Sequence, residues 1–579
     1  MSFDTRLSPA RVSAAAASQL PRWALFGLLI AYIGFGLFGR DPWYAEDASG
    51  LGIMAAMAHG GAADWWLPNI AGEWMTEEGP LPFWVGALFV ILLGPLTGDA
   101  QAARLSCALW FAVGTTALWY ATYRLARRRE ALPVSFAFGG EAAPRDYGRM
   151  LADIAVLLLL GTIGIVLRMH ETTAETAAIA WVGAALFGLV LALDAPLRGA
   201  LLTGLSIGAL ALSRGPGPAA WLLLAAALVM WFNLDRSLRA RAIVIAVAGT
   251  IVCAALWPLG SFVAADPARA DFWAAWRGSQ AEAIALPRLA DLGWIPRNLA
   301  WFTWPLWPLA AWTAYSWRHA LRLPHIALPG AALLALFGAL LTWRPVGDSA
   351  LMLMVPPLVL LAAFGATSLR RSLDNLIDWF AIATFSLFAL AAWLYFVAMT
   401  WGTPPRMAAS VMRLVPGFEP ALRPLALALA IAATLGWLAL VAWRIGRRPP
   451  MLWRGPVLAA SGLTMLWLLL VTLFLPAVNY NRSYAPIAAE VRAQADRSAP
   501  GSCVVGFRLS AAHKALFSHH GGLRFASPGT GADCDLLLQR DSRRTHLDDG
   551  PPDGDWTLVW EGRWPPRADE TLRLYRRGL

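Results

Sequence analysis

Polar and charged side chains that can do chemistry gather directly after the first long apolar run of the chain. They are Arg40, Asp41, Tyr44 and Glu46. A carboxylate can take a proton from an attacking hydroxyl or amine, and a guanidinium can hold a phosphate. We therefore expect Asp41 to be catalytic and the other three to contact a substrate. The alternative is an interfacial helix over 44–59, with Asp41 or a neighbour as its cap.

A second acidic pair, Glu77 and Glu78, lies in segment 74–84, where Pro and Gly turn the chain back toward the apolar stretch that follows. We expect both carboxylates to contact a substrate. A simple Pro/Gly turn that leaves two solvated carboxylates is the alternative.

A third polar group, formed by Arg168, His170 and Glu175, stands between two apolar runs. Its start resembles a His-Glu-x-x-His zinc helix, but Ala174 stands where the second His would be, which argues against that motif. Glu175 heads the next apolar run, either as a charge favoured by the helix dipole or as a site carboxylate. We expect Glu175 to be catalytic, and Arg168 and His170 to contact a substrate.

Three further arginines complete the candidate site. Arg214 stands at a Gly/Pro break between two apolar runs, where freed backbone donors and a guanidinium can face one anion; a tight turn with a snorkelling Arg is the alternative. Arg277 and Arg344 lie in later polar connections. Acids and guanidinium groups together at membrane level suit a lipid-anchored phosphate substrate. We expect no required cofactor; the acids can bind a divalent metal, although no ligand spacing demands one.

The elements that position these residues are predicted to be membrane helices. Of the 579 residues, 58% are hydrophobic and only 15% are charged, which excludes a soluble globular protein, a disordered chain and a disulfide scaffold. We predict a mainly α, polytopic membrane protein with about 13 spans. They lie at 23–39, 103–125, 150–168, 173–194, 198–213, 215–233, 241–262, 297–316, 325–343, 348–368, 376–400, 421–443 and 453–475.

The distribution of Arg sets the expected topology. Arg clusters such as 124–129 and 236–241 fall in alternate connections, and the positive-inside rule places them in the cytoplasm with the N-terminus. This assignment requires that Pro82–Leu96 be interfacial or re-entrant, within an outer loop over 40–102. It also explains the net charge of +10 without a nucleic-acid partner. We therefore expect a multi-pass protein of the bacterial inner membrane.

The tail changes character and is expected on the outer, periplasmic side. We predict a transmembrane domain over 1–475 and a soluble α/β domain over 476–579, because short polar-apolar segments there are separated by Gly, Pro and Asp. Cys503 and Cys534 lie in this tail, and they can pair there or stay reduced.

The order of these motifs resembles that of GT-C membrane glycosyltransferases that use polyprenyl-phosphate sugars, such as protein O-mannosyltransferases and the lipid A aminoarabinose transferase. That group carries Asp-Glu-x-Arg-Tyr-Ala-Glu, Phe-Glu-Lys-Pro-Pro-Leu-Pro-Tyr-Trp, a carboxylate heading the fourth span, and Thr-Lys-Gly-Pro. The matching stretches here are 41–46, 76–84, Glu175 and 213–216. This chain departs from the pattern at Trp43, at Glu78 in place of Lys, and at Arg214 in place of Lys.

The resemblance implies a GT-C fold and inverting transfer of a hexose or pentose from a polyprenyl phosphate. The acceptor would be a lipid, glycan or protein at the periplasmic face. Asp41 would orient or deprotonate the acceptor, and Arg214, with Arg277 or Arg344, would hold the phosphate. The rival hypothesis is a lipid-glycan transporter or a non-catalytic membrane scaffold; no internal repeat of the kind found in transporters is evident.

Overall fold

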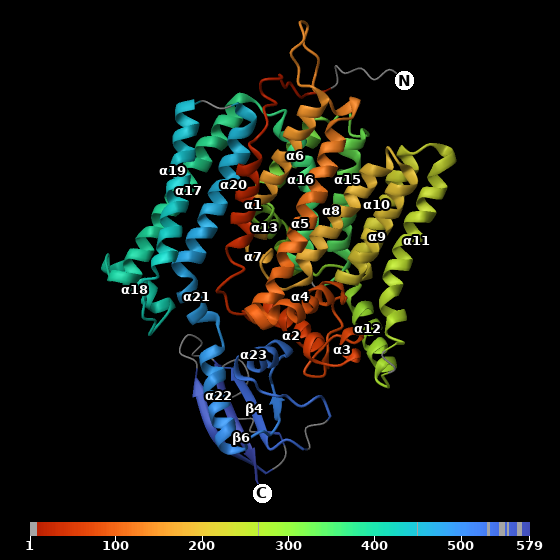
Figure 1. Ribbon diagram of the computed structural model, residues 1–579. Coiled ribbons are helices and arrows are strands. Elements are labelled where there is room, and N and C mark those ends of the chain that lie inside the picture. The colour runs from red at the N-terminus through yellow and green to blue at the C-terminus, as the bar shows by residue number, and fades with distance from the viewer. Residues whose placement is uncertain are drawn as a thin grey trace.

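The computed structural model describes residues 8–263, 266–344, 346–447, 450–529, 533–542, 551–552, 555–563 and 570–578. Its helices form one bundle, with a small α/β domain at one end and the N-terminal segment at the opposite end (Figure 1). This confirms the mainly α architecture with a C-terminal sheet domain.

Within the described residues, ten helices are long and apolar enough to cross a membrane. Nine are separate elements: α5 (Asp99–Ala126), α8 (Ala174–Ala192), α9 (Pro196–Arg214), α10 (Pro216–Asn233), α11 (Arg236–Gly260), α15 (Pro324–Thr342), α16 (Asp348–Ala366), α17 (Arg371–Trp401) and α19 (Pro424–Arg447). The tenth starts as α20 (Met451–Leu469) and continues through η3 (Leu470–Phe474) into α21 (Leu475–Arg482).

The other three expected spans are shorter or broken. The first is α1 (Arg22–Gly34), which ends just before Gly36; a φ of +101° and the Trp467 ring beside it leave no room for a side chain there. The second divides into α6 (Pro144–Leu160) and α7 (Ile165–Arg168). The third divides into α13 (Leu289–Phe302) and α14 (Leu306–Ser316) at Pro305, which cannot continue a hydrogen-bonded turn.

The connections contain further short elements. They are α2 (Glu46–His59), α3 (Ala62–Trp66), β1 (Asn69–Ile70), β2 (Glu73–Trp74), α4 (Leu81–Thr97), η2 (Arg129–Ala131), α12 (Arg269–Ala283) and α18 (Pro405–Leu414). The stretch expected to be interfacial or re-entrant is α4, which packs on α2 and α5 near the α/β domain (Figure 1).

The C-terminal domain contains a four-stranded sheet in the order β3-β4-β6-β5, parallel between β3 and β4 and antiparallel elsewhere. Its elements are α22 (Ala485–Ser498), β3 (Val504–Phe507), α23 (Ala511–Gly521), β4 (Leu536–Ser542), β5 (Trp556–Arg563) and β6 (Glu570–Arg577). Cys503 and Cys534 form a disulfide at the start of the parallel pair. Buried Ala48 of α2 joins the hydrophobic core of this domain, so α2 connects it to the bundle.

Candidate functional site

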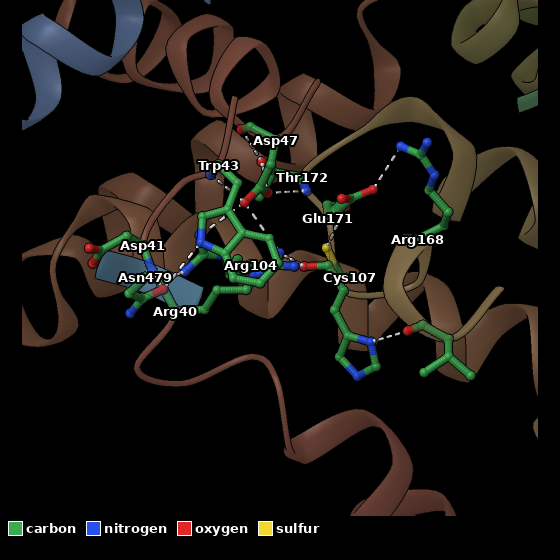
Figure 2. A network of polar contacts seen from close by, with 12 residues as sticks. Arg40, Asp41, Trp43, Asp47, Arg104, Cys107, Arg168, Glu171, Thr172 and Asn479 are labelled. Carbon is green, nitrogen blue, oxygen red and sulfur yellow. Dashed lines mark hydrogen bonds and ion pairs between the residues drawn. The ribbon is translucent and has the colours of Figure 1, made fainter. Parts of the chain in front are cut away.

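Asp47 lies on α2, at the bundle end nearest the α/β domain (Figure 1), and is the centre of a buried polar network (Figure 2). Its Oδ2 accepts hydrogen bonds from Arg40 Nη2 at 3.2 Å and Arg104 Nη2 at 3.0 Å. Its Oδ1 accepts from the backbone N–H and the hydroxyl of Thr172, each at 2.9 Å. Burial opposes ionisation, but Arg40 and Arg104 together with these bonds lower the pKa of Asp47 to about 2. Asp47 is therefore a fully engaged carboxylate that joins the segment after α1 to α5 and to the segment before α8.

Asp41 lies at the edge of this network, and its carboxylate points away from it (Figure 2). The Asp41 backbone N–H donates to Asn479 Oδ1 at 3.3 Å, and Asn479 also accepts from Trp43 Nε1 at 3.1 Å and donates to Gly39 O at 3.0 Å. Within the described part of the chain, no hydrogen bond engages the half-buried Asp41 carboxylate. The charge of Asp41 acts on His519 and His520 of α23. A fixed backbone with a carboxylate free of hydrogen bonds is the arrangement that a general base needs.

Arg214 brings two of the expected carboxylates together. Its Nη1 pairs with Glu78 Oε1 and lies 3.6 Å from Glu175 Oε1. Glu175 is buried at the start of α8, and among the described residues its second oxygen has no hydrogen-bond partner. The site therefore places two carboxylates against one guanidinium.

Burial, together with this excess of acid, raises the pKa of Glu78. Burial raises the pKa first, Arg214 lowers it, and the neighbouring carboxylates Glu175 and Glu77 raise it again, to about 7. Near neutral pH, Glu78 therefore exists in both charged and protonated forms. An anion that approaches Arg214 competes with the charged form.

A second guanidinium joins the start of α16 to this end of the bundle. Arg168 Nη1 pairs with Glu171 Oε2 at 3.0 Å, and its Nη2 pairs with Asp348 Oδ2 at 3.2 Å. Burial raises the pKa of Glu171, while Arg168 lowers it. Exposed Glu46 lies close enough to Arg168 to act on its charge. Asp348 and Glu175 head α16 and α8, where the helix dipole favours negative charge.

The side chains of His170 and Tyr44 contact other parts of the protein in this arrangement. His170 is fully buried, with Nδ1 2.6 Å from Val166 O and Nε2 3.0 Å from Tyr32 O, and both contacts are to backbone. The Tyr44 ring lies 4.5 Å from the His513 ring of the C-terminal domain.

The remaining expected residues lie apart from the buried cluster or at its rim. Glu77 is exposed beside Glu78, and Arg277 is exposed on α12. Arg344 Nη2 donates to Leu286 O at 2.5 Å. The neighbouring residue Trp343 packs against Gly217, which lies three residues after Arg214.

Sequence reasoning missed Arg104, Thr172 and Asn479 as members of the site. Arg104 is the one of these with a sequence signal, because a charge inside an apolar run is costly and usually functional or paired. Thr172 and Asn479 carry no such signal, since their roles arise from the meeting of distant segments. Among the residues that the structure describes, no three His, Cys, Asp or Glu side chains come together to hold a metal ion.

No protein-family model and no curated protein sequence matches this chain. Solved structures do match it. ArnT from Cupriavidus metallidurans aligns over 95% of this chain and 97% of its own, with a TM-score of 0.65 and 16% identity in the apo state. The structure of the same protein bound to undecaprenyl phosphate aligns over the same shares of the two chains, with a TM-score of 0.64 and 17% identity.

This chain has the GT-C fold of ArnT. The archaeal oligosaccharyltransferase AglB from Archaeoglobus fulgidus, in complex with an inhibitory peptide and a dolichol phosphate, also matches, with a TM-score of 0.41 and 11% identity over 90% of this chain and 69% of its own.

Proposed function

We propose that this protein is a membrane glycosyltransferase that moves a sugar from a polyprenyl phosphate to a hydroxyl or amine of a lipid, glycan or protein. The observation that carries the proposal is the unengaged Asp41 carboxylate beside fully engaged Asp47, at the site end of a GT-C bundle. The donor class is supported by the fold shared with ArnT, which has been solved with undecaprenyl phosphate.

The proposed reaction is one inverting displacement. The acceptor oxygen or nitrogen bonds to the anomeric carbon as the bond from that carbon to the phosphate oxygen breaks. The polyprenyl phosphate leaves with the electron pair, and the acceptor proton passes to Asp41. Arg214, with Arg344 or Arg277, balances the charge that grows on the leaving phosphate. No metal is needed in this scheme, and its side of action is the periplasmic face of the inner membrane.

Positioning roles fall to the other expected residues. Arg40 and His170 hold the loop that carries Asp41, through the Arg40 hydrogen bond to His170 O at 2.6 Å. Tyr44, Glu46 and Arg168 shape the acceptor side. Glu77, Glu78 and Glu175 control access of the phosphate to Arg214.

The test is release of free polyprenyl phosphate when the purified protein is incubated with polyprenyl-phosphate sugars and candidate acceptors. We expect Asp41→Asn to reduce transfer by about 10²–10⁴-fold with unchanged donor binding. Asp235→Asn, an exposed acid at the other end of the bundle, is the matched control. Full transfer by Asp41→Asn would remove Asp41 from the chemistry, and saturable binding without release by the wild type would favour a transporter or scaffold.

A further inference from the structure

A basic pocket lies at the end of the bundle opposite the α/β domain. It has a volume of about 420 Å³ and is lined by Arg124, Arg127, Arg128, Arg129, Glu130 and Asp194. The arginines come from the last turns of α5 and from η2, and Asp194 comes from the turn between α8 and α9. Its distance along the helices from Asp41 and Arg214 makes it independent of the site described above.

Internal ion pairs fix two of the four arginines. Asp194 pairs with Arg124 Nη1 at 3.4 Å and with Arg128 Nη1 at 2.9 Å, and Arg128 Nε pairs with Glu130 at 2.7 Å. Arg127 extends over the Tyr123 ring at 5.0 Å. Within the described residues, Arg127 and Arg129 have no carboxylate partner. Four guanidinium groups against two carboxylates leave the pocket with two uncompensated positive charges.

Apolar side chains border the pocket on the outside of the bundle. Tyr120 lies one turn before Arg124 on α5 and is 46% exposed, and Leu197 and Leu201, on the first turns of α9 after Asp194, are 42% and 47% exposed. A ligand with a phosphate in the pocket and a hydrocarbon chain along this border would satisfy both surfaces. Arginine suits such a headgroup, because its planar fork donates two hydrogen bonds to phosphate oxygens.

We propose that this pocket binds the phosphate of an anionic membrane lipid, with the acyl chain against Tyr120, Leu197 and Leu201. The positive-inside rule places this end at the cytoplasmic leaflet, where basic pockets between helices recognise such headgroups. Arg127 and Arg129 supply the positive charge that binds the phosphate. Asp194 and Glu130 fix the positions of Arg124 and Arg128 through ion pairs, and their negative charge limits the affinity for the phosphate.

The experiment measures binding of short-chain phosphatidylglycerol to the full-length protein in neutral detergent by native mass spectrometry. We expect saturable binding, and binding about ten- to thirty-fold weaker for Arg127→Gln/Arg129→Gln. The control is Arg236→Gln/Arg241→Gln, which removes two exposed charges from the same end and should bind like the wild type. Asp194→Asn should bind more tightly, because it frees Arg124 and removes one of the two ion pairs of Arg128.

Three results would overturn the proposal. An equal loss of phosphatidylglycerol binding in the pocket variant and in the control would mean that the general surface charge attracts the lipid. Equal binding of short-chain phosphatidylcholine would remove the need for net negative charge. Binding of glycerol 3-phosphate as tight as that of phosphatidylglycerol would replace the lipid by a soluble phosphate compound.

Discussion

Asp41 and Asp47 lie six residues apart but have different surroundings. Asp47 accepts bonds from two buried guanidinium groups and from Thr172, whereas the Asp41 carboxylate points away from that network. Six residues of separation allow this, because α2 begins between them and turns Asp47 inward. Neutralising Asp47 should therefore lower the stability of the protein, whereas neutralising Asp41 should lower its transfer activity.

Asp47→Asn should be destabilising, because it leaves Arg40 and Arg104 buried without their counter-charge. We expect a loss of about 3–5 kcal/mol in the free energy of unfolding. Thermal unfolding in detergent measures this as a lower melting temperature. Asp41→Asn is the matched comparison and should melt like the wild type, so an equal loss in both variants would contradict the division of roles.

Glu78 should make donor binding depend on pH. Its raised pKa, about 7, means that the carboxyl gains a proton as the pH falls through neutrality and then stops competing for Arg214. A phosphodiester donor keeps its single charge over this range. We therefore expect donor affinity, measured without acceptor, to rise about ten-fold between pH 8 and pH 6.

The Glu78→Gln variant should bind the donor with the higher affinity at both pH values. The control Asp235→Asn neutralises an exposed acid at the other end of the bundle and should keep the pH dependence. An unchanged pH dependence in Glu78→Gln would assign the titration to another group.

The element that sets the geometry of the site is α2. It approaches the segment before α8 so closely that a Cβ at Gly50 would lie 1.5 Å from Thr172 O. This contact keeps Asp47 within reach of the Thr172 backbone, and it places Ala48 in the core of the C-terminal domain. One helix thus fixes both the polar network and the attachment of the α/β domain.

Gly50→Ala should displace α2, break the bonds between Asp47 and Thr172, and lower the melting temperature and transfer together. The control is Gly278→Ala on α12, where a Cβ meets nothing within 4 Å. In this control, the gain in helix propensity should raise the free energy of unfolding by about 0.5–1 kcal/mol. Equal behaviour of the two variants would show that α2 tolerates a larger separation.

At the scale of the whole molecule, the α/β domain closes the site end of the bundle. Lys514 Nζ of α23 pairs with Glu73 at 3.0 Å, and the Cβ of Ala515 lies 2.7 Å from the position of a Cβ on Gly52. The Cys503–Cys534 disulfide stabilises this domain. A disulfide persists in an oxidising compartment, which the proposed periplasmic side of the membrane would provide.

Protein purified from membranes without reductant should yield a peptide that joins Cys503 to Cys534. We expect the Cys503→Ser/Cys534→Ser variant to lose roughly 3–4 kcal/mol of domain stability, because the bond closes a loop with a sequence separation of 31. Limited proteolysis of the tail measures the loss. Cys107 and Cys253, in α5 and α11, should be recovered as free thiols, and a fully reduced tail would contradict the outer location.

The sequence by itself determined the membrane class, most spans and the segments of the α/β domain, because long apolar runs and alternating patterns follow from local burial. It also indicated Glu78, Glu175 and Arg214, since charges at the ends of apolar runs are costly without a role. The two divided spans were predicted as continuous, and α1 as longer, because apolar composition alone does not locate a break or an end. Only the tertiary structure separated Asp41 from Asp47 and added Arg104, Thr172 and Asn479. These roles depend on contacts between segments up to 440 residues apart, which no local pattern encodes.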